Sequence, residues 1–178
     1  RGLGDVYKRQ DYLYTKHGNK QTALKCPDHL MFLTDILEVF PQSKIIWVHR
    51  NPKDSISSYC PMIESVWNLF LGGDNKKKVL PFIANLYKRM LKKAMADRDK
   101  GNLNIIDISF NDLIKNRQKV VDTLSSKLDF PIIPKKTKNK KPSFFKNKFN
   151  YNPEEYGVSK YDIHGEFDFY LKQYSNYL

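Results

Sequence analysis

Strand-like and helix-like hydrophobic patterns alternate along the chain. Lys44–Val48, "KIIWV", is a continuous β-branched and aromatic run, which is typical of a parallel strand buried on both faces. Residues 103–110, "LNIIDISF", form a second strand candidate, and Thr22–Cys26, "TALKC", a shorter third one. Together they predict an α/β fold with a parallel sheet.

Apolar residues at helical spacing predict the helices around these strands. Pro27 and Asp28 open a helix before the strand at 44–48, so the strand before it, the helix and that strand form a βαβ unit. We expect Pro61 to kink or split the next helix because its ring clashes with the preceding turn. The other expected helices are 81–97, which is long and basic, 111–130, and 159–174, where Ser159 and Asp162 are spaced as a capping pair.

Length and composition fit one main domain. The chain has 178 residues, of which 40% are hydrophobic, and no apolar run approaches the length of a membrane span. Residues 1–21 show no clear pattern, so we interpret them as a foreign or disordered leader and residues 22–178 as the domain. Two cysteines are too few for a disulfide framework, which favours a cytoplasmic location.

The charge is strongly positive. Lysine and arginine number 31 against 19 acidic residues, a formal net charge of +12. This excess favours an anionic partner, whether nucleic acid, phospholipid or a small phosphorylated ligand, and it does not choose among them. Much of it lies in residues 76–100 and in 134–150, where a solvated surface is the simpler interpretation.

Candidate anion-binding groups lie just after the strand at 44–48. Arg50 follows its carboxyl end, where parallel sheets bind ligands, and Asn51 is a good N-cap for the next helix. The backbone N–H groups of residues 53–55 and the hydroxyls of Ser55 and Ser58 should point to the same space. The alternative is a structural arginine with capping serines.

The same stretch carries a family resemblance. "RNPKDSISSYC" resembles the 3′-phosphate-binding motif of sulfotransferases that use 3′-phosphoadenosine 5′-phosphosulfate (PAPS), with the motif arginine at Arg50 and its serine at Ser58. Further segments resemble the same family in the same order, from Ala23 to Tyr174. They are "LKCPDHL", "FPQSKIIWVHR", "ISFNDLIKN" with "VVDTLSSKLDFPI", and "FNYNPEEYGVSKYDI".

The resemblance implies a parallel-sheet, P-loop-like sulfotransferase fold that moves a sulfuryl group from PAPS, without a metal, to a hydroxyl or amine acceptor. Arg50 and Ser58 would bind the 3′-phosphate of this anionic nucleotide. Phe110 would lie near the adenine, and Lys146 and Lys148 would contact the nucleotide from a loop near the carboxyl end.

The sequence also departs from the family pattern. The family's first strand and its P-x-S-G-T-T phosphosulfate turn have no counterpart before Leu24, so we expect a fold that is incomplete at its N-terminal side. The Golgi stays an alternative location for the same reason. Phe110 stands where the family has tyrosine, Arg117 where it has proline, and Phe149 where it has histidine.

Sulfuryl transfer to an alcohol needs a base for the acceptor's proton and cations for the leaving phosphate. We interpret His29 as the candidate base and Lys25 as the candidate stabilising cation. The alternative for His29 is a hydrogen bond to the helix end. A carboxylate near the missing turn serves as base in other branches. His49 is expected to pack or cap.

Two other functions stay open. A basic module could bind nucleic acid through the lysine-rich tail and its aromatic residues, but the collinear motifs would then be unexplained, so we expect no nucleic-acid partner. Another phosphate-handling P-loop-like enzyme would need a Walker lysine loop, which is not visible. The sequence therefore favours a sulfotransferase.

Overall fold

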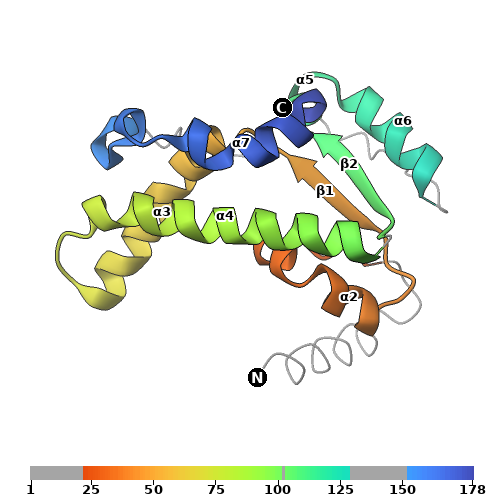
Figure 1. The fold of residues 1–178 in the computed structure, drawn as a ribbon, viewed down its shortest axis with the longest axis horizontal. Helices are drawn as coiled ribbons and strands as arrows, with labels where there is room; N and C mark the ends of the chain where they lie inside the picture. Colours follow the sequence, from red (N-terminus) through yellow and green to blue (C-terminus); the bar gives the residue numbers. More distant parts are fainter. Residues whose placement is uncertain (1–21, 102, 129–151) are drawn as a thin grey trace, which may run out of the picture.

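A small parallel sheet joins the helices of this chain. The computed structural model describes residues 22–101, 103–128 and 152–178, and this part is mostly helical (Figure 1). Strands β1 (Ile45–His49) and β2 (Ile105–Ser109) run parallel, with Ile45 beside Ile105 and His49 beside Ser109. Both strands lie within the segments predicted from their β-branched runs, and the parallel pairing fits an α/β architecture.

Two long helices form the crossover between the strands. Helix α3 (Pro52–Leu71) follows β1, and α4 (Lys76–Gly101) packs against α3 and leads to β2. Figure 1 shows that the turn between them lies far from the sheet. The other elements are η1 (Pro27–Met31), α2 (Leu33–Val39), α5 (Phe110–Lys115), α6 (Arg117–Lys127), η3 (Pro153–Tyr156), η4 (Val158–Lys160), α7 (Ile163–Gln173) and η5 (Ser175–Tyr177).

The two faces of the sheet belong to two hydrophobic clusters. Trp47 and Ile105 pack into the main cluster with residues of α3, α4 and α7. Ile106 and Ile108, which point the other way because side chains alternate along a strand, pack with Val120 of α6. This alternation decides which residues at the strand ends enter the core.

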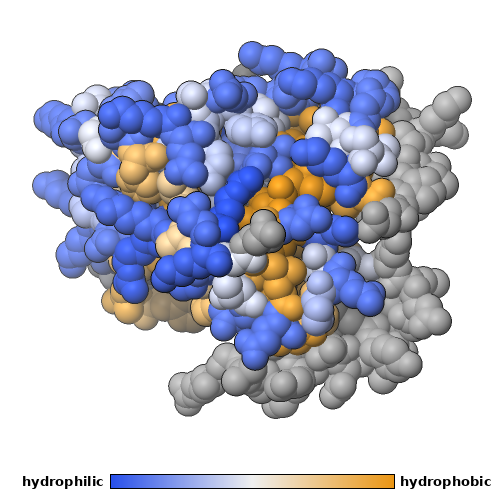
Figure 2. All heavy atoms as spheres, turned by 45° about the vertical axis from the view of Figure 1, so that its right-hand side comes forward, coloured by the Kyte–Doolittle hydropathy of each residue, from blue (hydrophilic) through white to orange (hydrophobic). Residues whose placement is uncertain are grey.

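On the second face, β1 is only partly covered. Ile46 is 42% exposed and Val48 41%, so the prediction that both faces of this strand are buried is wrong for the described chain. Their neighbours Ile106 and Ile108 on β2 are buried in the cluster that includes α6. Figure 2 shows a hydrophobic area bordered by hydrophilic side chains on the face that it presents.

The third predicted strand is wrong. Residues 22–26 have no regular secondary structure and are mostly exposed, and the sheet of the described chain contains β1 and β2 alone. A strand needs a partner for its backbone hydrogen bonds, and this segment pairs with neither strand. The observed strand–helix–strand unit is therefore β1–α3–α4–β2 rather than one that begins at Thr22.

Several predicted helices have different ends. Pro61 does not split α3, because buried Ile56 and Cys60 before it and Ile63 and Trp67 after it all pack on the main cluster. The helix expected at 111–130 is two helices, because the Asn116 side chain caps a new one. Predicted helix 159–174 begins at Ile163 instead. Its N-cap is Asp162, which accepts from the Gly165 N–H, so Ser159 is not its capping partner.

Candidate phosphate-binding site

Arg50 lies at the carboxyl end of β1, where the parallel register sets its neighbours. His49 pairs with Ser109, so Arg50 and Phe110, the residues that follow the two strands, leave the sheet side by side. The Arg50 guanidinium carbon lies 4.6 Å from the centre of the Phe110 ring. This is within the range of a cation–π contact, which fixes the direction of the guanidinium.

Ser58 contacts the same guanidinium. Arg50 Nη1 donates to Ser58 Oγ at 3.4 Å, across eight residues of sequence. The Ser58 hydroxyl donates its own proton to the Ser55 carbonyl oxygen at 2.9 Å. The structure thus brings together three residues that the sequence predicts for nucleotide binding, Arg50, Ser58 and Phe110. An anion at Ser58 would require this hydroxyl to turn away from Ser55.

The N-terminus of α3 offers fewer free donors than the sequence suggests. The Lys53 N–H donates to the Asn51 side chain at 2.9 Å, and the Ser55 N–H donates to the Asn51 carbonyl at 3.0 Å. Asn51 is therefore the predicted N-cap, but these two N–H groups are already used. Charge at this site comes mainly from the Arg50 guanidinium, with the positive end of the α3 dipole beside it.

Tyr87 of α4 is a neighbour that sequence reasoning missed. Burial raises the pKa of its phenol, and the Ser55 side chain and the positive charge of Arg50 oppose this rise. Both groups therefore lie close enough to act on the phenol. Tyr87 carries no motif, and only its inward place on an amphipathic helix could have drawn attention to it.

His49, the residue before Arg50, belongs to a buried polar network. Its Nε2 lies 2.8 Å from Asp107 Oδ1, and its Nδ1 lies 2.8 Å from the Tyr170 hydroxyl. Arg98 holds the same carboxylate with two hydrogen bonds of 2.7 Å. When His49 donates from Nε2 to Asp107, its Nδ1 accepts from Tyr170. The expectation that His49 packs rather than reacts agrees with this placement.

The network shifts the pKa values of its members. Burial by itself would raise the pKa of Asp107, but hydrogen bonds from His49 and Arg98 outweigh it and lower the pKa to about 2. Burial raises the pKa of Tyr170, and a hydrogen bond from the Arg50 backbone opposes that rise. The network therefore holds His49, the last residue of β1, from inside.

The predicted catalytic residues are not in contact with this site. Lys25 is exposed in the irregular segment before η1, and His29 lies half-buried within η1. The 3-10 helix η1 packs against α4 and α2. Lys146 and Lys148 lie outside the described residues.

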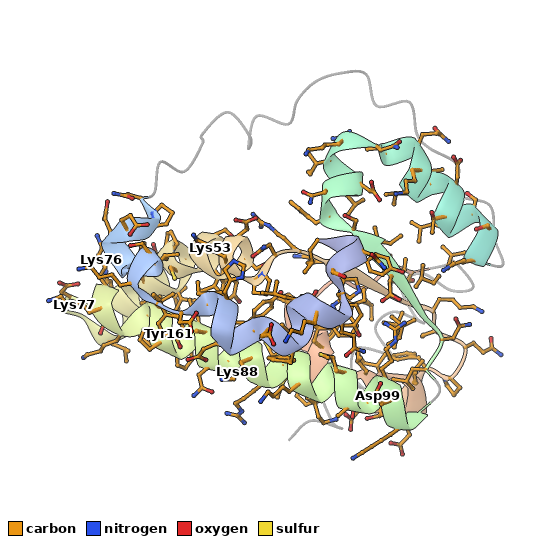
Figure 3. The ribbon with its side chains drawn as sticks, turned by 45° about the horizontal axis from the view of Figure 1, so that its top comes forward. Lys53, Lys76, Lys77, Lys88, Asp99 and Tyr161 are labelled. Atoms are coloured by element: carbon orange, nitrogen blue, oxygen red, sulfur yellow. The ribbon has the colours of Figure 1, made fainter. Side chains whose placement is uncertain are left out.

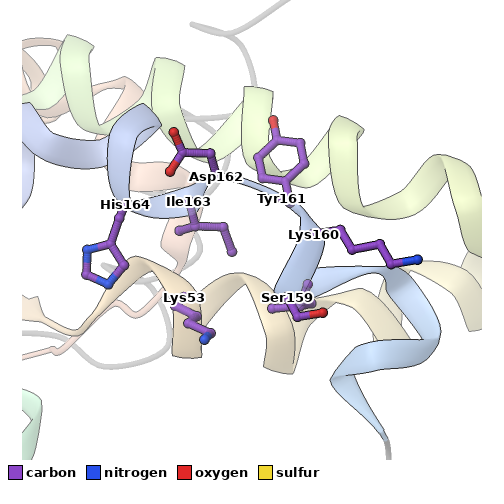
Figure 4. Close-up of a pocket in the computed structure, with 8 residues that line it drawn as sticks. Lys53, Ser159, Lys160, Tyr161, Asp162, Ile163 and His164 are labelled. Atoms are coloured by element: carbon purple, nitrogen blue, oxygen red, sulfur yellow. The ribbon is translucent and has the colours of Figure 1, made fainter.

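A polar groove lies beside the first turn of α3. Its volume is about 330 Å³, and Figure 4 shows Lys53 of α3 across from His164 of α7. The other lining residues come from the segment that enters α7: Val158, Ser159, Lys160, Tyr161, Asp162 and Ile163. In the described chain, no group of three or more His, Cys, Asp or Glu side chains is placed to hold a metal ion.

Comparison with known proteins gives one match. Residues 4–134 match the family model described as "Sulfotransferase family". This match covers β1, the Arg50 site and β2, and it begins within residues 1–21, whose assignment as a leader stays a prediction. Searches of curated proteins and of solved structures returned no match. Because the family model spans more than half of the chain, the protein belongs to the sulfotransferase family.

Proposed function

We propose that this protein transfers a sulfuryl group from PAPS to a hydroxyl or amine acceptor. Membership in the sulfotransferase family supports sulfuryl transfer in general. The choice of PAPS as donor rests on the motif from Arg50 to Ser58. In this proposal both side chains bind the 3′-phosphate, and Phe110 lies beside the adenine.

The observation that carries the proposal is the placement of the Arg50 guanidinium. It lies at the carboxyl end of a parallel strand, between the Ser58 hydroxyl and the Phe110 ring. Among the described residues it has no carboxylate partner within ion-pair distance, so its charge is available for a ligand. Arginine binds phosphate through two parallel N–H donors, which makes it the main contact of this site.

The reaction requires further groups, for which we keep the sequence-based assignments. The acceptor oxygen or nitrogen forms a bond to sulfur while the bond from sulfur to the 5′-phosphate oxygen breaks, and adenosine 3′,5′-bisphosphate leaves. The acceptor's proton goes to a base, for which His29 is our candidate. Lys25 would stabilise charge on the sulfuryl oxygens, and Lys146 and Lys148 would contact the nucleotide.

Calorimetry with two nucleotides tests the donor assignment. The protein should bind adenosine 3′,5′-bisphosphate at least about tenfold more tightly than adenosine 5′-monophosphate, because one charge-assisted phosphate contact is worth about 1.5–3 kcal/mol. Equal affinity would contradict the assignment of a 3′-phosphate site. Tight oligonucleotide binding that the bisphosphate does not compete with would support the nucleic-acid alternative instead.

A further inference from the structure

The C-terminal end of α3, just before the turn into α4, carries an exposed apolar tip, which we define as Leu69, Phe70 and Leu71. Leu69 and Phe70 are each 78% exposed and Leu71 is 70% exposed. Gly72 and Gly73 follow in the left-handed region, with φ of 69° and 74°, so the chain can turn sharply into α4. The turn lies at the end of the helical pair away from the sheet (Figure 1).

The shape of the apolar tip limits what can cover it. Successive residues on a helix point about 100° apart, so three exposed neighbours face about 200° of the helix circumference. A flat protein face, such as that of a second copy, would cover one side of this tip and leave the rest in water. A soft apolar phase that admits the tip end-on covers all three side chains at once.

Further apolar surface continues from the tip. Met62 and Val66 on α3 and Phe82 on α4 are also exposed, and the Phe82 ring lies 4.9 Å from that of Trp67. Contiguous exposed apolar patches of this kind mark protein or membrane interaction sites, whereas single hydrophobic residues on a surface are normal. The patch is thus most exposed at Leu69–Leu71 and less exposed along the sides of both helices.

Lysines follow the tip a few residues along the chain, at the start of α4. Helix α4 begins with Lys76, Lys77 and Lys78, of which Lys77 and Lys78 are exposed. Lys76 is paired with Glu155 at 2.5 Å, and Asp74 is the acid within the turn itself. Figure 3 shows Lys76 and Lys77 at this end of α4 and Asp99 toward its other end.

We propose that the apolar tip inserts into an anionic lipid surface. Leu69, Phe70 and Leu71 enter the boundary between headgroups and acyl chains, while Lys77 and Lys78 bind the acidic headgroups. Apolar side chains flanked by lysines are the combination by which peripheral proteins bind anionic bilayers. None of the described helices is long and apolar enough to cross a membrane, so this is contact with one surface. The proposal does not depend on the sulfotransferase activity.

Co-sedimentation with lipid vesicles tests the proposal. The full chain is mixed with vesicles of phosphatidylcholine alone or with phosphatidylserine added. We expect binding at least about tenfold stronger to the phosphatidylserine vesicles. The triple variant Leu69→Ser, Phe70→Ser, Leu71→Ser should lose most of this binding, although its net charge is unchanged. Ile114→Ser on α5, an exposed apolar residue elsewhere, is the matched control and should bind as the native chain does.

A second pair of variants tests the contribution of the lysines to lipid binding. Lys77→Glu with Lys78→Glu should weaken binding to phosphatidylserine vesicles about tenfold or more, whereas Lys100→Glu with Lys127→Glu, the same charge change at other exposed sites, should weaken it less. Absence of native binding, or equal binding by the native chain and the triple serine variant, would overturn the proposal. Equal losses in the two lysine pairs would also overturn it, because adsorption by net charge alone would explain them.

Discussion

His49 and Arg50 are consecutive residues with opposite environments. His49 is fully buried and bonded to Asp107 and Tyr170, which lie 58 and 121 residues away along the chain. Arg50 is partly exposed and contacts Ser58 and Phe110 at the surface. One peptide bond thus separates a structural network from the candidate ligand site.

The difference follows from strand geometry. Side chains alternate along β1, so Trp47 and His49 face the main cluster while Ile46 and Val48 face the other side. Arg50 continues the second series and leaves the strand on the more open side. We infer that the network stabilises the fold and positions the strand end, whereas Arg50 is free to bind a ligand. Measurements of stability and of nucleotide binding distinguish these two roles.

The largest effect is expected on stability. Asp107→Asn removes the charge that Arg98 and His49 share and leaves their donors poorly satisfied in a half-buried site. Breaking a buried ion pair from one side lowers the free energy of unfolding by about 3–5 kcal/mol. Urea denaturation at neutral pH measures it, and we expect a loss of about 3 kcal/mol.

Two controls belong to this measurement. Asp122→Asn changes an exposed aspartate that accepts from Gln118 and should shift the free energy of unfolding by less than about 0.5 kcal/mol. Arg50→Ala removes an exposed cation–π contact and should cost about 0.5–1 kcal/mol. If Arg50→Ala destabilised the protein as much as Asp107→Asn does, the separation between network and ligand site would be wrong.

The second largest effect is expected at acid pH, where the network should stabilise the folded protein less. The folded-state pKa of Asp107 is about 2, below its ordinary value of 3.8, so the folded protein binds fewer protons than the unfolded chain between these values. The stabilisation from this carboxylate is complete above about pH 4 and is lost as the pH falls toward 2. We expect it to amount to about 2 kcal/mol.

Urea denaturation at pH 5 and pH 2.5 measures this loss, with the Asp107→Asn variant alongside. Other carboxylates titrate in both proteins, so the difference between the two losses belongs to Asp107. Identical pH dependence in native protein and variant would show that the carboxylate is not held by Arg98 and His49 in solution.

A smaller effect is expected for nucleotide binding by Ser58. Its hydroxyl donates to the Ser55 carbonyl and must give up that bond to donate to a phosphate, so the net gain is small. Ser58→Ala should weaken binding of adenosine 3′,5′-bisphosphate by about threefold to tenfold in calorimetry. Ser126 makes the same kind of bond, to the Thr123 carbonyl at 2.9 Å, and Ser126→Ala should leave affinity unchanged. Equal effects of the two variants would remove Ser58 from the site.

The sequence predicted the parts of the fold that local pattern determines. Both observed strands are β-branched runs, and Asn51 caps α3 as expected. The prediction of a strand at 22–26 was wrong because strand formation depends on a partner strand, which a local pattern does not supply. Pro61 stays within one helix because packing on both sides outweighs its local penalty. Tertiary contacts decided each of these cases.

The candidate site divides in the same way. The motif from Arg50 to Ser58 and the aromatic residue at 110 could be found because fixed spacing along the chain encodes their positions. Tyr87 and the network of His49, Asp107, Arg98 and Tyr170 could not, because their partners come from distant elements. Lys25 and His29 stay predictions, since the described contacts do not join them to Arg50.

The most direct test is a thermodynamic cycle in which Arg50 and the 3′-phosphate are removed separately and together. Calorimetry compares adenosine 3′,5′-bisphosphate with adenosine 5′-monophosphate on the native protein and on Arg50→Ala, with Arg89→Ala on the exposed side of α4 as control. The native protein and the control should prefer the bisphosphate by about tenfold or more, and Arg50→Ala by less than about threefold. A preference that survives unchanged in Arg50→Ala would contradict the assignment of Arg50 as the phosphate ligand.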